Sequence, residues 1–145
     1  MKSRREFLKS SKNVAIIACC AGSASLLLES CGSVKYAPYG VNKNLLSLSK
    51  AEFEKRDFVL VDFPKLLAPL YIKKVSDIEY RAFLMLCTHK QCTIMANGAI
   101  LACPCHGAEF SSLGKVLQGP AEKDLAEYPV EILEEKIIIN AGPNE

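Results

Sequence analysis

The chain has 145 residues, 50% of them hydrophobic, which is enough for one modest domain and a targeting segment. Its 18 basic and 16 acidic side chains give a net charge of +2. This balance lacks the dense positive charge of a nucleic-acid-binding protein, so nucleic acid is not an expected partner. Residues before Cys31 hold five Lys/Arg and two acidic side chains, which leaves the body of the chain close to neutral.

Residues 1–30 are interpreted as an export leader. Arg4 and Arg5 stand just before Phe7 and Leu8, a pattern similar to bacterial twin-arginine signals. The apolar run from 14 to 28 is shorter than the roughly 20 residues that a membrane-spanning helix needs. A signal sequence therefore fits it better, with an ordinary secretion signal or a basic amphipathic helix as the alternatives.

The leader ends in a segment that resembles a lipoprotein cleavage box, Leu28-Glu29-Ser30-Cys31. In this interpretation Cys31 is the lipidated first residue of the mature chain, although Glu29 is unusual for such a box. The alternative is a leader that is retained as a membrane anchor. Both predict an exported domain tethered to the periplasmic side of the cell membrane, with 31–44 as the tether.

Short apolar and β-branched runs, separated by turn signals, predict a compact antiparallel β-structure over 45–145. The expected strands are Leu45 to Leu48, Phe58 to Phe63, Leu70 to Val75, Ala82 to Leu86, Thr93 to Met95, Ile100 to Ala102, Glu127 to Leu133 and Lys136 to Asn140. Turn signals lie at Pro64, Asn97-Gly98, Gly114 and Gly119-Pro120. Helix is expected only as a turn or two within 50–56.

Four of the seven cysteines and both histidines lie in one short window. They fall in two segments, Cys87-Thr88-His89-Lys90-Gln91-Cys92 and Cys103-Pro104-Cys105-His106-Gly107. Each segment follows an expected strand or hairpin, so the two are expected on facing loops. A thiolate and an imidazole two or three residues apart on a loop can bind one metal centre, and each segment supplies such a pair.

Three simpler interpretations compete with a shared redox centre. A structural zinc site of two cysteines and two histidines usually keeps like ligands together, whereas here they alternate and two cysteines are left over. Two plain disulfides would leave the histidines without a role. A catalytic Cys/His pair explains the number of cysteines less well.

The two segments resemble the C-x-H-x-x-C and C-P-C-H-G motifs of the Rieske iron–sulfur family. The likeness is strong over 83–128, extends through the body from about Val41, and includes Gly119-Pro120-Ala121, which is similar to the family's proline loop. It implies an all-β, Rieske-like antiparallel β-sandwich with a small cluster-binding subdomain. It also implies one [2Fe–2S] cluster per chain. Cys87 and Cys103 would ligate one iron, His89 and His106 would ligate the other, and Cys92 and Cys105 would form a disulfide between the loops.

The sequence departs from the high-potential members of this family at two places. Where those members have a Ser and a Tyr that donate hydrogen bonds to cluster sulfurs, this chain has Ala108 and Phe110. Neither side chain can donate, so we expect a potential in the lower or middle part of the roughly −150 to +300 mV Rieske span. Gln91 also replaces a glycine that is common in the first loop.

The resemblance and the leader together predict a one-electron carrier. It would serve a membrane or periplasmic oxidoreductase complex, either a quinol-oxidising complex of the cytochrome bc type or another exported enzyme such as an arsenite-oxidase-like pair, and pass electrons to a c-type cytochrome or a similar acceptor. The chain is not expected to be an enzyme by itself. A zinc-stabilised module and the ferredoxin component of a dioxygenase are the alternatives, and the leader weighs against the second.

Overall fold

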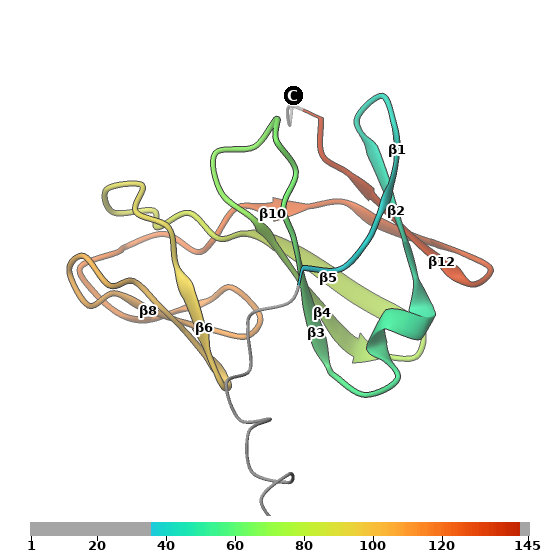
Figure 1. Cartoon of the computed structure of the whole chain (residues 1–145). Helices are drawn as coiled ribbons and strands as arrows, with labels where there is room; N and C mark the ends of the chain where they lie inside the picture. Colours follow the sequence, from blue (N-terminus) through green and yellow to red (C-terminus); the bar gives the residue numbers. More distant parts are fainter. Residues whose placement is uncertain (1–35, 143–145) are drawn as a thin grey trace, which may run out of the picture. The chain divides into compact units, whose positions relative to one another are not determined.

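The computed structural model describes residues 36–142, and this part of the chain is almost entirely β-structure (Figure 1). Its twelve strands form three four-stranded sheets in which all pairs are antiparallel. The first sheet has the order β1 (Gly40–Asn42), β2 (Leu45–Ser49), β12 (Lys136–Asn140), β11 (Val130–Leu133). The second has the order β10 (Glu127–Tyr128), β5 (Glu79–Leu84), β4 (Leu70–Ser76), β3 (Phe58–Val61). The third has the order β6 (Met95–Asn97), β7 (Ile100–Ala102), β8 (Glu109–Ser111), β9 (Val116–Gln118).

The first sheet buries one face through strict alternation of its side chains. Leu46 and Leu48 of β2 are fully buried, as are Ile137 and Ile139 of β12, while their neighbours along each strand are exposed or half-buried. The register places Leu46 opposite Ile139 and Leu48 opposite Ile137. Directly opposed residues point to the same face of a sheet, so these four side chains form one continuous apolar patch.

The second sheet is instead buried on both faces. Its central strands carry consecutive buried residues: Val59 to Val61 in β3, Leu70 to Ile72 in β4, and Ala82 to Leu84 in β5. Such continuous apolar runs are typical of strands that are covered on both sides. This sheet is therefore the centre of the larger part of the fold.

The third sheet forms the small subdomain that carries the two Cys/His loops. In Figure 1 its strands β6 and β8 lie to one side of β3, β4 and β5. Its core contains Leu101 and Phe110, which are fully buried and directly opposed on β7 and β8. The hairpin between β6 and β7 turns at Gly98, whose φ of +61° fits the turn expected at Asn97-Gly98.

Phe83 of β5 joins the larger part of the fold to the subdomain. Its ring packs against Gly114, where an added Cβ would lie 2.7 Å from Phe83 Cδ1. Gly114 also has a φ of +73°, so both space and backbone conformation require glycine here. The N–H of Leu84 donates to the carbonyl of Ala126 (2.9 Å), which fixes the end of β5 against the segment that returns from the subdomain.

The predicted all-β antiparallel fold class is confirmed, and the expected helical turn is a single 3₁₀ turn, η1 (Lys50–Phe53). Strands β8 and β9 were not expected, and β1 lies within the segment assigned to the tether, where it pairs with β2. The export leader and Cys31 lie outside the described residues. Within 36–142 no helix is long and apolar enough to cross a membrane.

Candidate metal centre

The first loop, 87–92, is closed by its own backbone. The N–H of Cys87 donates to the carbonyl of Cys92 (2.8 Å), and the N–H of Gln91 donates to the carbonyl of Cys87 (2.8 Å). Gln91 has a φ of +56°, in the left-handed region that glycine adopts most easily. The glycine that is common at this position would therefore adopt the left-handed φ with less strain than Gln91.

The second loop, 103–108, repeats this arrangement. The N–H of Cys103 donates to the carbonyl of Ala108 (2.8 Å), and the N–H of Gly107 donates to the carbonyl of Cys103 (3.1 Å). Gly107, at the position that matches Gln91, has a φ of +74°. Both loops thus turn in the same way, and each begins with a cysteine whose backbone is hydrogen-bonded on both sides.

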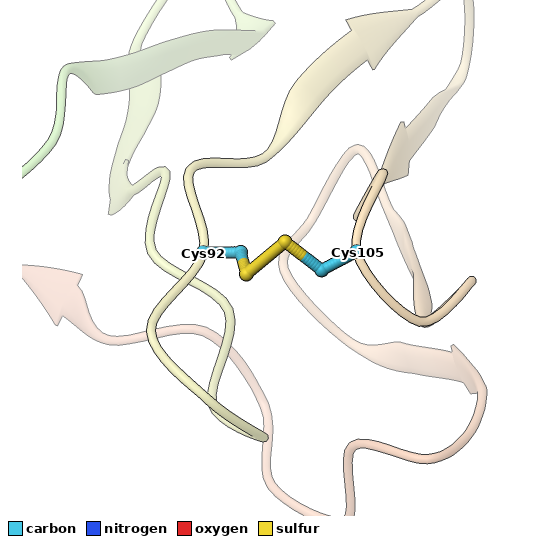
Figure 2. The surroundings of a disulfide bond; sticks show 2 residues. All are labelled: Cys92 and Cys105. Carbon is cyan, nitrogen blue, oxygen red and sulfur yellow. A yellow bond between two sulfur atoms is a disulfide. The ribbon is translucent and has the colours of Figure 1, made fainter.

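A disulfide between Cys92 and Cys105 joins the two loops, as Figure 2 shows. It is the pair that the family resemblance implied. The Cα atoms are 6.5 Å apart and the sequence separation is 13 residues. Closing a loop of this size stabilises the fold by about 3 kcal/mol on the chain-entropy description. Cys92 is half-buried and Cys105 is exposed.

The other two cysteines are free thiols that point into the protein. Cys87 is 2% exposed and Cys103 is 3% exposed. Burial raises the pKa of the Cys87 thiol, and the neighbouring Cys103 thiol raises it further. Backbone N–H groups of His89 and Lys90 approach the Cys87 sulfur and act in the opposite direction, because they stabilise the thiolate. The raised pKa means that burial favours the protonated thiol of Cys87 in the metal-free chain, while the two N–H groups partly offset that effect.

The two histidines face the other way. Both side chains are exposed, and their rings lie edge to face with centroids 5.0 Å apart and planes at 86°. The structure therefore brings His89 and His106 together at the surface, and places the free thiols of Cys87 and Cys103 beside one another in the interior.

The segment 118–124, called the third loop here, begins at the last residue of β9, contains Pro120 and holds both ligand loops in place. The hydroxyl of Thr88 donates to the carbonyl of Lys123 (2.6 Å), and Nε2 of Gln118 donates to the carbonyl of Gly107 (3.0 Å). Pro120 itself is exposed. Each of these bonds joins a side chain to the backbone of a distant segment, and no local sequence pattern signals such a bond, so sequence reasoning missed both.

Asp124 fixes the end of this third loop. Its Oδ1 accepts from the N–H of Val116 (2.9 Å) and its Oδ2 pairs with Nζ of Lys115 (2.7 Å). The hydrogen bond from Lys115 lowers the pKa of the Asp124 carboxyl, and the Val116 N–H lowers it further. The carboxylate is thus kept charged where it ties the loop to β9.

Ala108 ends the second loop and Phe110 follows it on β8, and both residues are fully buried. Ala108 accepts the N–H of Cys103, and Phe110 sits between Leu101 and Val116 in the subdomain sheet. Neither side chain carries a hydrogen-bond donor. The structure thus confines both positions to the water-free interior behind Cys103.

The model of one protein family, the Rieske [2Fe-2S] domain, matches residues 47–129. The chain belongs to this family. Among solved structures, the plasma membrane Rieske protein of the cyanobacterium Synechocystis PCC 6803 is 30% identical, and the match covers 64% of this chain and 95% of that one with a TM-score of 0.55.

Curated relatives include two iron-sulfur subunits of cytochrome b6-f complexes. The subunit of Chlorobaculum tepidum is 39% identical over 57 residues, which is 38% of this chain and 32% of the relative. A cyanelle subunit of Cyanophora paradoxa is 34% identical over 71 residues, which is 48% of this chain and 30% of the relative. The matched part thus spans about a third of these relatives.

The cofactor of this Rieske domain is a [2Fe–2S] cluster, and the residues present fit it. Two buried thiols and two exposed imidazoles stand on matched loops, as two irons with different ligands require. Three sulfurs of the site, those of Cys92, Cys103 and Cys105, lie within 4.8 Å of one another. Two of these form the disulfide, which leaves Cys103 as the available ligand of that group.

Proposed function

We propose that Cys87 and Cys103 bind one iron of the cluster and that His89 and His106 bind the other. The observation that carries this assignment is the opposed placement of the four side chains, two thiols below 4% exposure and two adjacent imidazoles at the surface. Cys92 and Cys105 are excluded as ligands while they remain joined.

When bound, the cluster accepts or donates one electron, at a potential raised by neutral imidazoles in place of two thiolates. The protein determines where that electron passes. With the cluster bound, the exposed rings of His89 and His106 would present their free N–H groups to a docked partner, so the electron would enter or leave at this edge. The buried thiols and the closed loops shield the opposite side of the centre from water.

We also propose that the chain is the iron-sulfur subunit of a quinol-oxidising complex of the cytochrome bc type and reduces a c-type cytochrome. Support comes from the cytochrome b6-f subunits among its relatives and from the disulfide between the ligand loops. The twin-arginine leader supports export and a tether to the periplasmic side of the membrane. The same leader argues against a dioxygenase ferredoxin. This chain is 22% identical to a chain in a solved complex of a dioxygenase with its ferredoxin, and at that identity the likeness shows the fold alone.

Electron paramagnetic resonance of the reduced full chain, titrated against potential, tests the ligand assignment. We expect a rhombic signal with the low average g value of mixed Cys/His ligation. Cys87→Ser and His89→Ala should abolish it, because each removes a ligand. The matched control Lys90→Ala, at an exposed position of the same loop, should retain it. A normal signal in Cys87→Ser, or zinc in place of iron in the wild-type chain, contradicts the assignment.

The role in a membrane complex needs a separate measurement. A tagged full chain, purified from membranes of its own cells in mild detergent, should bring with it haem b and haem c, seen in reduced-minus-oxidised spectra. Addition of a quinol should then reduce the c-type haem. Recovery of the chain without haem, in the soluble periplasmic fraction, would contradict this role and leave the electron carrier with another partner.

A further inference from the structure

The Cys92–Cys105 disulfide lies close to the sulfur of Cys103, which is not part of the disulfide. The sulfurs of Cys92, Cys103 and Cys105 all lie within 4.8 Å of one another, although only Cys103 is a proposed cluster ligand. The thiol of Cys87 is in turn a neighbour of Cys103. Three sulfurs therefore lie together between the two loops, and the Cys87 thiol contacts one of them.

This spacing is close to what a tetrahedral thiolate site needs. With zinc–sulfur bonds of about 2.3 Å, the sulfurs of such a site are about 3.8 Å apart. The Cys103 sulfur lies within 4.8 Å of both disulfide sulfurs, and the sulfurs of Cys92 and Cys105 would move apart to a similar spacing once their bond is broken. Thiolates are soft ligands that select Zn²⁺, Cd²⁺ and Cu⁺ over harder cations.

We propose that the disulfide sets the metal selectivity of the cluster site. In the cluster-free chain, its reduction creates a thiolate site for a soft d¹⁰ cation, formed by Cys92, Cys103 and Cys105. Cys87 or a water molecule completes the coordination. While the disulfide is closed, two of the three thiolates are missing and the site does not form. This inference rests on the proposed function only in that Cys103 belongs to both sites.

The chemical step needs an external dithiol as reductant. The dithiol gives up two electrons and two protons, the Cys92–Cys105 bond breaks, both residues become thiols, and the reductant becomes a cyclic disulfide. Three thiol protons then leave as the cation binds. Cys105 is exposed, so a small dithiol can reach its sulfur directly.

Because Cys103 is shared, a soft cation and the cluster exclude one another. In a chain whose disulfide is closed, zinc meets only one free thiol of this group, and the two buried thiols and the two imidazoles remain for the cluster. A chain kept reduced would be open to loading with the wrong metal.

The test compares the cluster-free full chain in its oxidised form and after reduction with a dithiol, which is removed anaerobically before metal is added. Cd²⁺ binding is followed by thiolate-to-metal absorption, and Zn²⁺ binding by the rise in Tm that a ligand of the folded state causes. We expect the reduced chain to bind at least about 10-fold more tightly than the oxidised chain, since it gains two thiolate ligands.

Matched variants identify the ligands. Every form, including the reference chain, carries Cys19→Ser, Cys20→Ser and Cys31→Ser, so no leader thiol reacts with the dithiol or binds the metal and differences between forms report on the body of the chain. Reduced Cys105→Ser should bind Cd²⁺ at least about 10-fold more weakly than the reduced reference chain. Reduced His89→Ala/His106→Ala should bind it equally well.

Three results overturn the inference: equal affinity of the oxidised and reduced chains, undiminished affinity of Cys105→Ser, or loss of binding in the histidine variant. The last result would point to a zinc site of two cysteines and two histidines. If Cys105→Ser does not fold, the comparison of metal affinity between the oxidised and the reduced reference chain still tests the inference. All these measurements use chain without cluster, so they fail or succeed independently of the paramagnetic resonance test of the cluster ligands.

Discussion

Restoring the two missing hydroxyls behind Cys103, with Ala108→Ser and Phe110→Tyr, should raise the midpoint potential of the cluster. Both positions are fully buried, so water does not compete with a new hydrogen bond there. A donor near the cluster sulfurs stabilises the more negative reduced form more than the oxidised form. The potential should therefore shift upward in each variant.

The magnitude follows from the energy of one hydrogen bond. If a buried hydroxyl distinguishes the two redox states by about 1 kcal/mol, the shift is about 40 mV for a one-electron couple. The double variant should then rise by roughly 80 mV, provided that the two bonds act independently. Ala99→Ser, in the exposed turn between β6 and β7, is the control and should leave the potential unchanged.

Redox titration followed by paramagnetic resonance or visible spectroscopy gives the midpoint potentials. Thermal unfolding gives the stability of each variant, which shows independently whether the new hydroxyl has a hydrogen-bond acceptor. A buried hydroxyl without an acceptor would cost about 1–3 kcal/mol of stability. A double variant with an unchanged midpoint and a lowered Tm would show that neither hydroxyl reaches a cluster sulfur. The reasoning about Ala108 and Phe110 would then be refuted.

Three further changes test the scaffold of the site by thermal unfolding of the full chain. Gln91→Gly should stabilise the fold by about 1 kcal/mol, because a left-handed φ costs glycine little. Gln91→Ala should give no such stabilisation, and equal effects of the two substitutions would argue against backbone strain at this position. Thr88→Val should destabilise it by about 1 kcal/mol through loss of the bond to Lys123, and Thr88→Ser, which keeps the hydroxyl, should not. Gly114→Ala should destabilise it by about 1–3 kcal/mol, since its Cβ would press on Phe83, and Phe83→Leu in the same chain should recover part of that loss.

Much of the fold was predictable because its signals are local. The alternation of Leu46 and Leu48, the continuous apolar run of β4, and the turn at Gly98 all indicate β-structure from a few neighbouring residues. Strands β8 and β9 lack such signals. Each has only three residues, and Glu109, Leu117 and Gln118 carry no clear alternation, so their pairing depends on the sheet around them.

The candidate site also has a part with local sequence signals and a part that depends on distant residues. The cysteines and histidines were predictable because ligand types at fixed spacing on two segments are a chemical pattern. The contacts that hold these segments were not, since Thr88 reaches a carbonyl 35 residues away and Gln118 one 11 residues away. The sequence marked Gln91 as standing in place of a common glycine, and its φ of +56° shows that the backbone keeps the left-handed conformation there without glycine.

The two ligand loops are supported separately, and this has a consequence for the histidines. Thr88 holds the loop of His89 to the third loop, while Gln118 holds the loop of His106 to the same segment. The disulfide between Cys92 and Cys105 joins both loops at one point. Loss of the Thr88 hydroxyl should therefore displace His89, a proposed iron ligand, and leave His106 in place. On the proposed ligand assignment the two imidazoles would then be inequivalent, which links the geometry of the third loop to the electronic structure of the centre.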